Sequence, residues 1–307
     1  MTRAVVFAYH NVGVRCLKVL LAHGVDVALV FTHEDDPAEN IWFDGVAKVA
    51  ADYGIPAITP DDPNTLERLH QIRDLKPDFI FSFYYRKMLS SDLLTIAPQG
   101  ALNIHGSLLP KYRGRVPVNW AIIHGEIETG ATLHYMVAKP DAGDIVGQTA
   151  VPILPDDTAG EVFNKVTLAA ELTLHRVLPS LIASNAPRLV QDLSQGSYFS
   201  GRKPEDGRID WNWSAQQIHN LVRAVAPPYP GAFTTINGQT ARILRTRMIE
   251  LETEPRLAPR LELVDGRLIA YCAGGGLLQI LALDLAGSPV IPAQLANQLD
   301  PGYWQLI

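Results

Sequence analysis

Apolar residues in the first half of the chain fall into short continuous runs separated by stretches of helical spacing. The runs predict strands over residues 4–8, 25–31, 57–59, 78–83 and 101–105. Between them, apolar residues three and four positions apart predict helices over residues 14–22, 42–53 and 64–75, the last beginning at a cap residue, Asn64. Strands apolar on both faces that alternate with helices are typical of an α/β fold with a doubly wound, Rossmann-like parallel sheet.

The pattern changes after this region. A long helix is expected over residues 156–184, which open with the acidic and capping residues Asp156, Asp157 and Thr158. Residues 191–207 are polar and contain Gly and Ser, which is typical of a linker. A further helix is expected over residues 214–225, before the breaker pair Pro227-Pro228.

The last hundred or so residues read as strands and tight turns. Apolar, β-prone runs are separated there by the turn pairs Asn237-Gly238 and Asp265-Gly266. We therefore expect a Rossmann-like domain over residues 1–190, a linker over 191–207 and a small, mostly β C-terminal domain over 208–307.

Composition and charge narrow the class of protein. The chain has 307 residues, 47% of them apolar, which suffices for one large or two ordinary domains. No apolar run reaches the roughly 18 residues of a membrane span, and the amino terminus leads directly into a strand-like run, so we expect a cytoplasmic protein. Cys16 and Cys272 are the only cysteines, which suits a reducing compartment and excludes a four-cysteine zinc site. The net charge of −6 argues against broad nucleic-acid binding.

The strongest candidate for chemistry is the strand over residues 101–105 and the loop after it. Asn103 and His105 are two positions apart and therefore project from the same face. An amide beside an imidazole at the end of a buried strand is hard to explain as core filling. The loop is rich in Gly and Pro and carries three cations that can meet an anion, Lys111, Arg113 and Arg115. We interpret this stretch as an active site, although loop cations alone are ordinarily solvated.

A third candidate lies in the turn after the strand that begins at His134. Asp141 stands in an Asp-X-Gly turn, and a carboxylate beside a histidine can orient the ring and raise its basicity. Asp144 is the other carboxylate of the turn, and such turns are common without any chemistry. Sequence spacing does not reveal whether Asp141 and His105 touch.

Two common cofactor motifs are absent from the sequence. The first strand-to-helix turn, residues 9–13, lacks the spaced glycines of a dinucleotide site, and no P-loop lysine pattern occurs. No clustered His and Cys spacing indicates a metal site. The fold is therefore expected to be Rossmann-like without a nicotinamide cofactor or a metal.

The motifs resemble the catalytic signature of the formyltetrahydrofolate-dependent formyltransferases. The signature residues are Asn103-X-His105, the following Ser107-Leu108-Leu109-Pro110, and Asp141 in its turn. The narrower resemblance is to the formyltransferase domain of the bifunctional polymyxin-resistance protein that acts on UDP-4-amino-4-deoxy-L-arabinose. It covers nearly the whole chain and includes residues 6–10, 31–33, 81–86, 106–114, 219–225 and 230–233.

This resemblance implies a formyltransferase fold with an OB-like C-terminal domain, and it implies roles for named residues. A primary amine attacks the formyl carbon of 10-formyltetrahydrofolate, and Asn103 donates a hydrogen bond to the oxyanion, worth roughly 3–4 kcal/mol in comparable sites. His105 moves the proton from the amine to the departing folate nitrogen, and Asp141 holds the His105 ring. The folate pocket is expected to be lined by Lys87, Met88, Leu89, Arg115, Val137, Ala138, Lys139, Pro140 and Asp141.

Three hypotheses for the function remain: an amino-sugar nucleotide formyltransferase, a methionyl-tRNA formyltransferase and a silent binding module. The favoured acceptor is UDP-4-amino-4-deoxy-L-arabinose, whose formylation belongs to lipid A modification in lipopolysaccharide biosynthesis and to polymyxin (antibiotic) resistance, with dTDP-linked 4-amino sugars as rivals. Methionyl-tRNA is disfavoured by the acidic balance and by the loop over residues 113–120. A catalytically silent folate- or nucleotide-binding module is disfavoured by the intact set of Asn103, His105 and Asp141. Because the chain ends soon after the β domain, we expect a free-standing formyltransferase, with any decarboxylase on another protein and no membrane partner.

Overall fold

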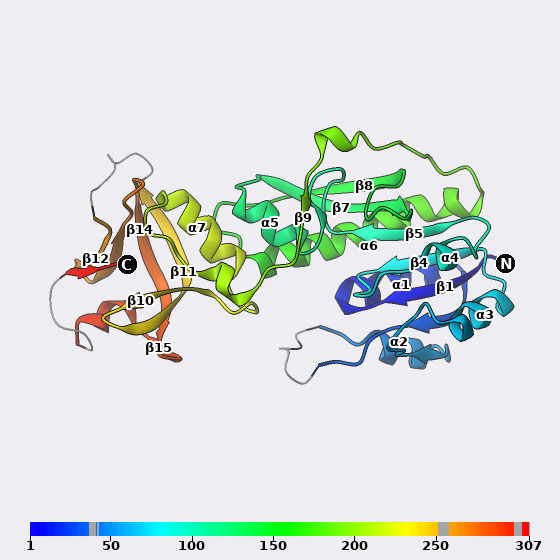
Figure 1. The fold of residues 1–307 in the computed structure, drawn as a ribbon, viewed down its shortest axis with the longest axis horizontal. Coiled ribbons are helices and arrows are strands. Elements are labelled where there is room, and N and C mark those ends of the chain that lie inside the picture. Colours follow the sequence, from blue (N-terminus) through cyan, green and yellow to red (C-terminus); the bar gives the residue numbers. More distant parts are fainter. Residues whose placement is uncertain (37–40, 42, 251–257, 298–302, 307) are drawn as a thin grey trace. The chain divides into compact units, whose positions relative to one another are not determined.

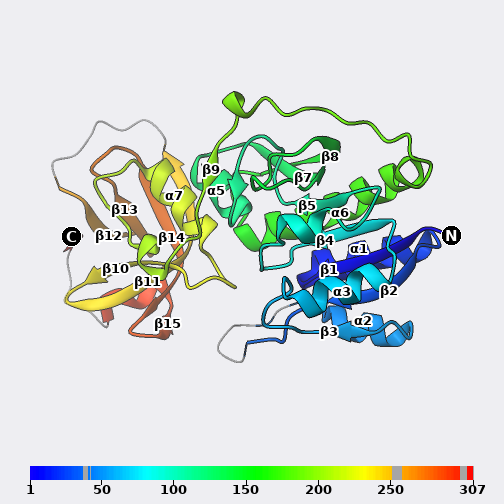
Figure 2. The same cartoon turned by 45° about the vertical axis from the view of Figure 1, so that its right-hand side comes forward.

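The computed structural model describes residues 1–36, 41, 43–250, 258–297 and 303–306 (Figures 1 and 2). The residues group into two compact units, which are described separately. The first unit comprises Met1–Pro117, Glu128–Pro152 and Asn164–Ser200, and the second comprises Val118–Ile127, Ile153–Phe163 and Gly201–Ile307. Two short segments that the sequence analysis placed in the first domain, residues 118–127 and 153–163, thus group with the second unit.

The first unit is built on a sheet with the strand order β3-β2-β1-β4-β5-β7-β8. The strands are β1 (Arg3–Ala8), β2 (Asp26–Phe31), β3 (Ala57–Ile58), β4 (Phe79–Phe83), β5 (Ala101–His105), β7 (Glu128–Tyr135) and β8 (Ile145–Pro152). Strands β1 to β5 pair in parallel, which confirms the predicted α/β class. Strand β7 runs antiparallel to β5, and the turn after β7 reverses the chain, so that β8 runs antiparallel to β7.

The described helices connect the strands, four of them where the periodicity predicts a helix and two short ones, over residues 91–94 and 117–123, where it does not. They are α1 (His10–Ala22), α2 (Val46–Asp52), α3 (Leu66–Asp74), α4 (Ser91–Leu94), α5 (Pro117–Ile123) and α6 (Ala159–Ile182). Helix α2 begins at Val46, later than predicted, after the extended residue Gly45; Trp42, the predicted first residue, lies outside the described residues. Thr158 and Glu161 exchange hydrogen bonds at the start of α6, as a capping pair does.

The N-terminal cap of α3 is Thr65 and not Asn64, the predicted cap residue. The capping residue is Thr65, whose hydroxyl accepts a hydrogen bond from the Arg68 N–H at 3.4 Å. Asn64 makes contacts with the loop after β4 instead, because its amide accepts from the Ser90 N–H at 2.7 Å and donates to the Met88 carbonyl at 3.0 Å. The predicted cap residue therefore ties two loops together.

The core of the first unit lies on the two faces of its sheet. On one face, side chains from β1, β2 and β4 pack against α3; this cluster includes Val5, Phe7, Leu29, Phe31, Ile80, Leu69 and Ile72. On the other face of β4, which alternates with that of Ile80, the Phe81 and Phe83 rings stack at 5.7 Å between centroids. Burial of both faces explains why β1 and β4 read as continuous apolar runs.

The second unit is an antiparallel β structure, as predicted. Its sheet has the order β10-β11-β14-β13-β12-β16, with β15 paired to β14. The elements are α7 (Ala215–Ala224), β10 (Ala232–Ile236), β11 (Gln239–Glu250), β12 (Arg260–Val264), β13 (Arg267–Tyr271), β14 (Leu277–Leu285), β15 (Ser288–Val290) and β16 (Tyr303–Gln305). Asn237 and Asp265 adopt left-handed conformations, with φ of 46° and 50°, which confirms both predicted tight turns.

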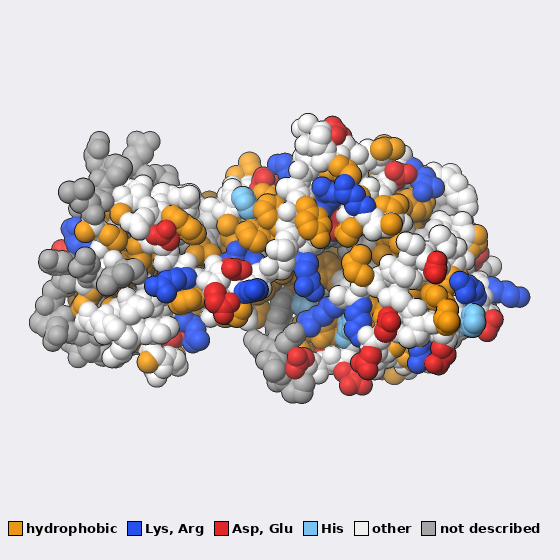
Figure 3. Space-filling view, viewed as in Figure 1, with side chains coloured by type: hydrophobic (Ala, Val, Ile, Leu, Met, Phe, Trp, Pro, Cys, Tyr) orange, Lys and Arg blue, Asp and Glu red, His pale blue; other side chains and the backbone are white. Residues whose placement is uncertain are grey.

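Among the described residues, two short strands and three 3-10 turns lie outside the two main sheets. Strands β6 (Arg113–Gly114) and β9 (Tyr198–Phe199) pair in parallel, and 3-10 turns occur at η1 (Leu193–Gln195), η2 (Pro204–Gly207) and η3 (Pro292–Asn297). Cys16 and Cys272 are buried free thiols. None of the helices in the described part of the chain combines the length and hydropathy of a membrane-spanning segment. Basic and acidic side chains intermingle on the face seen in Figure 3.

Candidate active site

The predicted reactive pair lies at the carboxyl end of β5. Asn103 and His105 share one face of this strand, and the antiparallel register places His134 and Thr132 of β7 opposite them. His105 is only 7% exposed, so its ring is held inside the protein. The site therefore forms where the parallel part of the sheet meets its antiparallel edge.

The His105 ring is fixed by the loop that follows its own strand. Its Nε2 lies 2.8 Å from the carbonyl oxygen of Tyr112, so this nitrogen carries the proton and donates it. Tyr112 adopts a left-handed conformation, with φ of 57°, and its N–H donates to the Ser197 hydroxyl at 2.9 Å. Because Nε2 is engaged, Nδ1 is the nitrogen that faces the Asp141 carboxylate, at 3.6 Å from Oδ1.

Asp141 is brought to the ring by a left-handed turn after β7, where its φ is 52°. The Gly114 N–H of β6 donates to its Oδ2 at 2.8 Å. The Gln191 amide stabilises the turn by donating hydrogen bonds to the carbonyls of Asp141 and Gly143, at 3.1 and 2.6 Å. The structure thus brings Asn103, His105 and Asp141 together, which the sequence could only suggest.

His134 is a fourth member of the site that the sequence analysis did not identify. Its Nδ1 donates to the Tyr135 carbonyl at 2.8 Å, so Nε2 is free to accept, and it accepts from the Asn103 amide Nδ2 at 3.1 Å. The same Nε2 lies 3.6 Å from Oδ1 of Asp141. His134 therefore orients the Asn103 amide. The antiparallel pairing of β5 with β7 reveals this role, and no motif in the sequence signals it.

The loop between β5 and β6 is pinned to the antiparallel strands. The Thr132 hydroxyl donates to the Ser107 carbonyl at 2.6 Å and accepts from the Leu109 N–H at 3.1 Å. Gln148 of β8 donates to Thr132 and to the Leu109 carbonyl, at 2.9 and 2.8 Å. The predicted Ser-Leu-Leu-Pro motif is thus the segment that holds the Tyr112 carbonyl in position under His105.

Burial and neighbouring charges set the protonation of the site. Burial lowers the pKa of His105 below its ordinary value, while the Asp141 carboxylate and the Tyr112 carbonyl oppose that shift. Burial also acts on Asp141, where it would raise the pKa, but His105 and the Gly114 N–H favour the carboxylate, and this pKa is held well below its ordinary value. The site therefore holds a neutral imidazole beside an ionised carboxylate at neutral pH.

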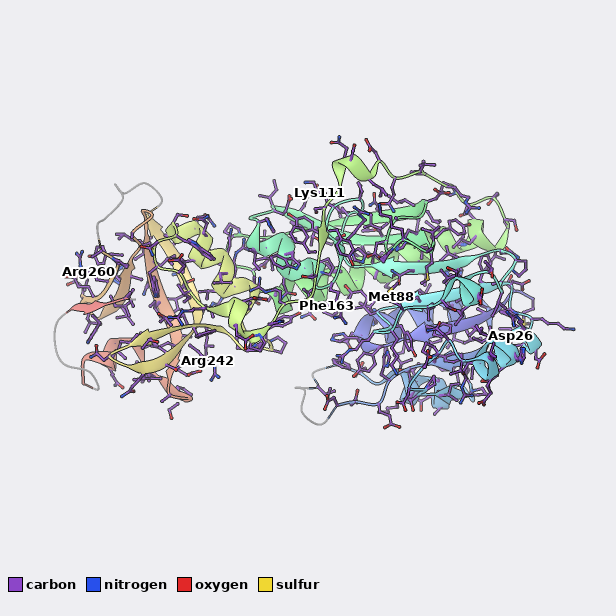
Figure 4. The ribbon with its side chains drawn as sticks, viewed as in Figure 1. Asp26, Met88, Lys111, Phe163, Arg242 and Arg260 are labelled. Atoms are coloured by element: carbon purple, nitrogen blue, oxygen red, sulfur yellow. The ribbon has the colours of Figure 1, made fainter. Side chains whose placement is uncertain are left out.

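The three loop cations have different surroundings. Lys111, labelled in Figure 4, and Arg115 are exposed, as expected for residues that can meet a ligand. Arg113 is only 7% exposed, and its Nε has no hydrogen-bond partner among the described residues. Arg113 is therefore buried, whereas the sequence predicts a solvated loop cation.

The residues predicted to line a folate pocket also differ in exposure. Met88, labelled in Figure 4, and Val137 are 63% and 46% exposed, and Ala138 and Lys139 are exposed beside them, with Pro140 half-buried. Lys87 donates to the carbonyls of Pro60, at 2.8 Å, and Asp61. Leu89 is 6% exposed and belongs to the core cluster of the first unit. Exposed side chains therefore stand on the loop after β4 and on the turn after β7, on either side of His105.

This arrangement can stabilise an oxyanion and transfer a proton. The Asn103 amide is a hydrogen-bond donor of fixed orientation, and His105 is a neutral base whose unprotonated Nδ1 lies 3.6 Å from the Asp141 carboxylate, which can stabilise the imidazolium. No group of three or more His, Cys, Asp and Glu side chains with metal-binding geometry occurs in the described ranges. The chemistry that the site supports is acyl transfer to a nucleophile.

Asp141→Asn is expected to lower kcat and to shift its pH dependence. Without the carboxylate, the effect of burial on His105 is opposed only by the Tyr112 carbonyl, so the pKa of His105 falls further. The acidic limb of the kcat/KM profile, where His105 becomes protonated, should move to lower pH. Asp144→Asn, in the same turn, should leave the profile in place. An unchanged profile in Asp141→Asn would remove this residue from the proton relay.

Gly114→Ala is expected to destabilise the protein by about 1–3 kcal/mol and to lower kcat. Gly114 has a φ of 96°, and an added Cβ would collide with the Phe199 carbonyl oxygen, displacing the N–H that holds Asp141. Gly54→Ala is the matched control, since Gly54 has a φ of 67° with open space around the added atom. Urea unfolding and turnover should show a larger loss at position 114; equal losses would contradict the collision.

Comparison with known proteins identifies the family. The formyl transferase family matches residues 11–178, and the formyl transferase C-terminal domain matches residues 202–299. The matched segments cover most of both units. The chain belongs to the formyl transferase family, which confirms the broader resemblance, to the formyltransferases, and it is a formyl-transferring enzyme by family.

Solved structures with the same fold include sugar N-formyltransferases. An N-formyltransferase from Helicobacter canadensis, solved with folinic acid and dTDP-3-aminofucose, is 21% identical, with a TM-score of 0.69 over 91% of this chain and 99% of that one. The sugar 3N-formyltransferase WlaRD, solved with dTDP and 5-N-formyltetrahydrofolate, is 21% identical, with a TM-score of 0.70 over 94% and 99%. Such likeness establishes the formyltransferase fold.

Proposed function

We propose that this protein transfers the formyl group of 10-formyltetrahydrofolate to the 4-amino group of a nucleotide-linked amino sugar. The observation that carries the proposal is the convergence of three groups in a formyl transferase family member: His105 lies 3.6 Å from Asp141. Asn103, on the same strand face as His105, is linked to Asp141 through His134. An oxyanion donor and a neutral base backed by a carboxylate are the groups that formyl transfer to an amine requires.

Each residue of the site has a defined task in this reaction. The amine nitrogen attacks the formyl carbon, and the carbonyl oxygen becomes an oxyanion that accepts a hydrogen bond from the Asn103 amide. His105 takes the proton lost by the amine and returns it to N10 of the folate as the C–N bond breaks. The N-formylated nucleotide sugar and tetrahydrofolate leave, and the site regains its neutral imidazole. Asp141 stabilises the imidazolium that exists between these steps.

The folate is proposed to lie across the two exposed loops beside His105. The donors and apolar surfaces available for it come from Lys87 and Met88 on the loop after β4, from Arg115 directly after β6, and from the segment 137–141 on the turn after β7. The core position of Leu89 leaves its backbone as the part available for contact. Both sugar formyltransferases with this fold described above were solved with a formylated folate, which supports the same co-substrate here.

The favoured acceptor is UDP-4-amino-4-deoxy-L-arabinose. The segments that resemble the polymyxin-resistance formyltransferase support this choice, because they extend from the first strand to the second unit. With this acceptor, the formylated product would belong to lipid A modification and polymyxin resistance, and we propose that the formylation takes place in the cytoplasm. dTDP-linked amino sugars are the second candidate, since the ligands named for the Helicobacter canadensis enzyme and WlaRD are dTDP compounds.

An acceptor panel tests this proposal. Purified protein is given 10-formyltetrahydrofolate and, in turn, UDP-4-amino-4-deoxy-L-arabinose, a dTDP-4-amino sugar and methionyl-tRNA, and release of tetrahydrofolate is followed. Turnover with the UDP sugar alone is expected. Turnover with the dTDP sugar alone would retain the mechanism and replace the acceptor, and turnover with tRNA alone would overturn the sugar proposal. Folate binding without turnover on any acceptor would indicate a silent module.

A further inference from the structure

The segment over residues 188–199, which we call the strap, leads from α6 to β9 along the β8 edge of the first sheet (Figures 1 and 2). From residue 191 onward the sequence predicts a linker, and a linker between domains makes few contacts with either of them. The strap instead belongs to the first unit. It contacts both of the backbone segments that hold the His105 ring.

The first contacts fasten the strap to the turn between β7 and β8. The backbone N–H and carbonyl of Leu189 exchange hydrogen bonds with those of Ile145, the first residue of β8, at 2.9 and 2.8 Å. The Arg188 guanidinium lies over the ring of Tyr135, the last residue of β7, at 3.9 Å from its centroid. Its Nε is 3.5 Å from the Asp144 carboxylate. The strap is therefore fixed at both ends of this turn.

The Gln191 side chain then holds the backbone of the same turn. It is 9% exposed, and its Nε2 donates to the carbonyls of Asp141 at 3.1 Å and Gly143 at 2.6 Å, which uses both hydrogens of the amide. Asp141 has a φ of 52°, a conformation that persists in a residue other than glycine only where its surroundings impose it. Gln191 is thus the side chain that fixes the backbone from which the Asp141 carboxylate projects.

Ser197 makes three hydrogen bonds around Tyr112. Its N–H donates to the Pro110 carbonyl at 3.3 Å, its hydroxyl accepts from the Tyr112 N–H at 2.9 Å, and its carbonyl accepts from the Arg113 N–H at 3.0 Å. The Phe199 ring stacks on the Tyr112 ring, with centroids 5.5 Å apart and planes 16° apart. Tyr112 is also left-handed, with a φ of 57°. The strap therefore holds the Tyr112 carbonyl, the acceptor of the His105 proton.

Both polar partners of the His105 ring thus depend on the strap. The Tyr112 carbonyl, 2.8 Å from Nε2, decides which ring nitrogen carries the proton, and the Asp141 carboxylate faces the other nitrogen at 3.6 Å. Among the described residues, the printed contacts of the ring go to these partners and not to Gln191 or Ser197. The two strap residues therefore act on the ring through its partners.

We propose that Gln191 and Ser197 are positioning residues for formyl transfer. Ser197 sets the tautomer of His105 by holding the Tyr112 carbonyl, and Gln191 keeps the Asp141 carboxylate beside the ring. The strap is then part of the framework of the active site and not only a connection to the second unit. This inference rests on the proposed function for its effect on turnover, whereas the state of the His105 ring can be measured without any turnover.

NMR of the full chain with 15N-labelled histidine tests the role of Ser197. In the wild type, His105 should be almost entirely the tautomer protonated at Nε2. Ser197→Ala should raise the fraction protonated at Nδ1, because the Tyr112 carbonyl is no longer held, and Ser197→Thr, which keeps the hydroxyl, should retain the wild-type signal. Ser194→Ala removes an exposed hydroxyl from the same strap and is the matched control. Equal tautomer fractions in Ser197→Ala and wild type would overturn the role of Ser197.

Gln191→Met keeps the length of the side chain and removes both donors. The Asp141 carboxylate opposes the effect of burial on the pKa of His105, so a loosened turn should lower this pKa. The acidic limb of kcat/KM should move to lower pH, and kcat should fall by about tenfold, the order found for residues that orient histidines at other sites. Gln195→Met, at an exposed position of the strap, should titrate as the wild type does. An unchanged His105 titration in Gln191→Met would overturn the role of Gln191.

Hydrogen exchange in the wild type provides a measurement that needs no variant. The Tyr112 amide hydrogen should exchange slowly, because the Ser197 hydroxyl accepts it. Exchange as fast as that of an open loop would contradict the role of the strap. The expected changes at His105 without formyl transfer to any amine would retain the strap and refute the proposed function. Formyl transfer with an unchanged His105 in both variants would refute the strap alone.

Discussion

His105→Ala is expected to lower kcat by about a thousandfold, within the range for loss of a general acid–base group. Its imidazole is the only group in direct contact with both the Asp141 carboxylate, at 3.6 Å, and the Tyr112 carbonyl among the described contacts of the site. Without it, the attacking amine has no positioned base and the departing nitrogen has no acid. Folate binding, followed by fluorescence or calorimetry, should change little.

The control for this prediction is His70→Ala, which removes an imidazole from the same unit at an exposed position on α3. It should retain wild-type turnover, and both variants should unfold at similar urea concentrations. Wild-type rates in His105→Ala would contradict the proton-transfer role. A loss of folate binding equal to the loss of rate would instead make His105 a ligand contact.

Asn103→Ala is expected to lower kcat by about 10²–10³-fold with little change in KM, as found when an oxyanion donor is removed. The amide is orientated by His134 at 3.1 Å and stands on the same strand face as His105. It strengthens its hydrogen bond only when the formyl oxygen becomes an oxyanion, so the transition state loses more than the bound substrate does.

Asn103→Asp separates this role from simple packing. The replacement keeps the shape of the side chain and replaces the donor with an acceptor that carries a charge, so it should be at least as inactive as Asn103→Ala. An effect confined to KM in either variant would argue against oxyanion stabilisation. A turnover rate in Asn103→Asp close to that of the wild type would show that only the shape of the side chain at position 103, and not its hydrogen-bond donor, matters for turnover.

Much of the fold could be predicted because its sequence signals are local. Continuous apolar runs identified β1 and β4, and the Asn-Gly and Asp-Gly pairs identified turns that do adopt positive φ. The start of α2 and the cap of α3 were missed. Thr65 and Asn64 are both good caps, and the choice between them depends on the loop after β4, which is distant in sequence.

In the candidate site, too, the residues with a local sequence signal could be predicted, and those that depend on contacts distant in sequence could not. Asn103 and His105 were visible because a strand of period two places them on one face, and Asp141 was suggested by its turn. Nothing local relates His134 to Asn103, since this depends on the antiparallel register of β5 and β7. The Tyr112 carbonyl and the Gly114 N–H are backbone groups, whose positions carry no signature in residue type.

The antiparallel edge explains why the proposed catalytic groups converge. β7 supplies His134 opposite Asn103, and the turn after β7 supplies Asp141. The Gly114 N–H of β6 donates a hydrogen bond to the Asp141 carboxylate. A sheet that continued in parallel beyond β5 would require a crossover connection in place of this short turn. The same turn carries exposed residues proposed to contact folate, so donor binding and the proton relay depend on one segment.

Transfer of a labelled formyl group tests the central claim most directly. 10-Formyltetrahydrofolate with a 13C formyl carbon is incubated with the protein and UDP-4-amino-4-deoxy-L-arabinose or a dTDP-4-amino sugar, and the nucleotide sugar is analysed by mass spectrometry and NMR. We predict a 13C formamide on the sugar amine in amounts equal to the tetrahydrofolate released, and almost none with His105→Ala. Release of tetrahydrofolate with unlabelled sugar, or equal labelling by His105→Ala, would contradict the assignment of this site to formyl transfer.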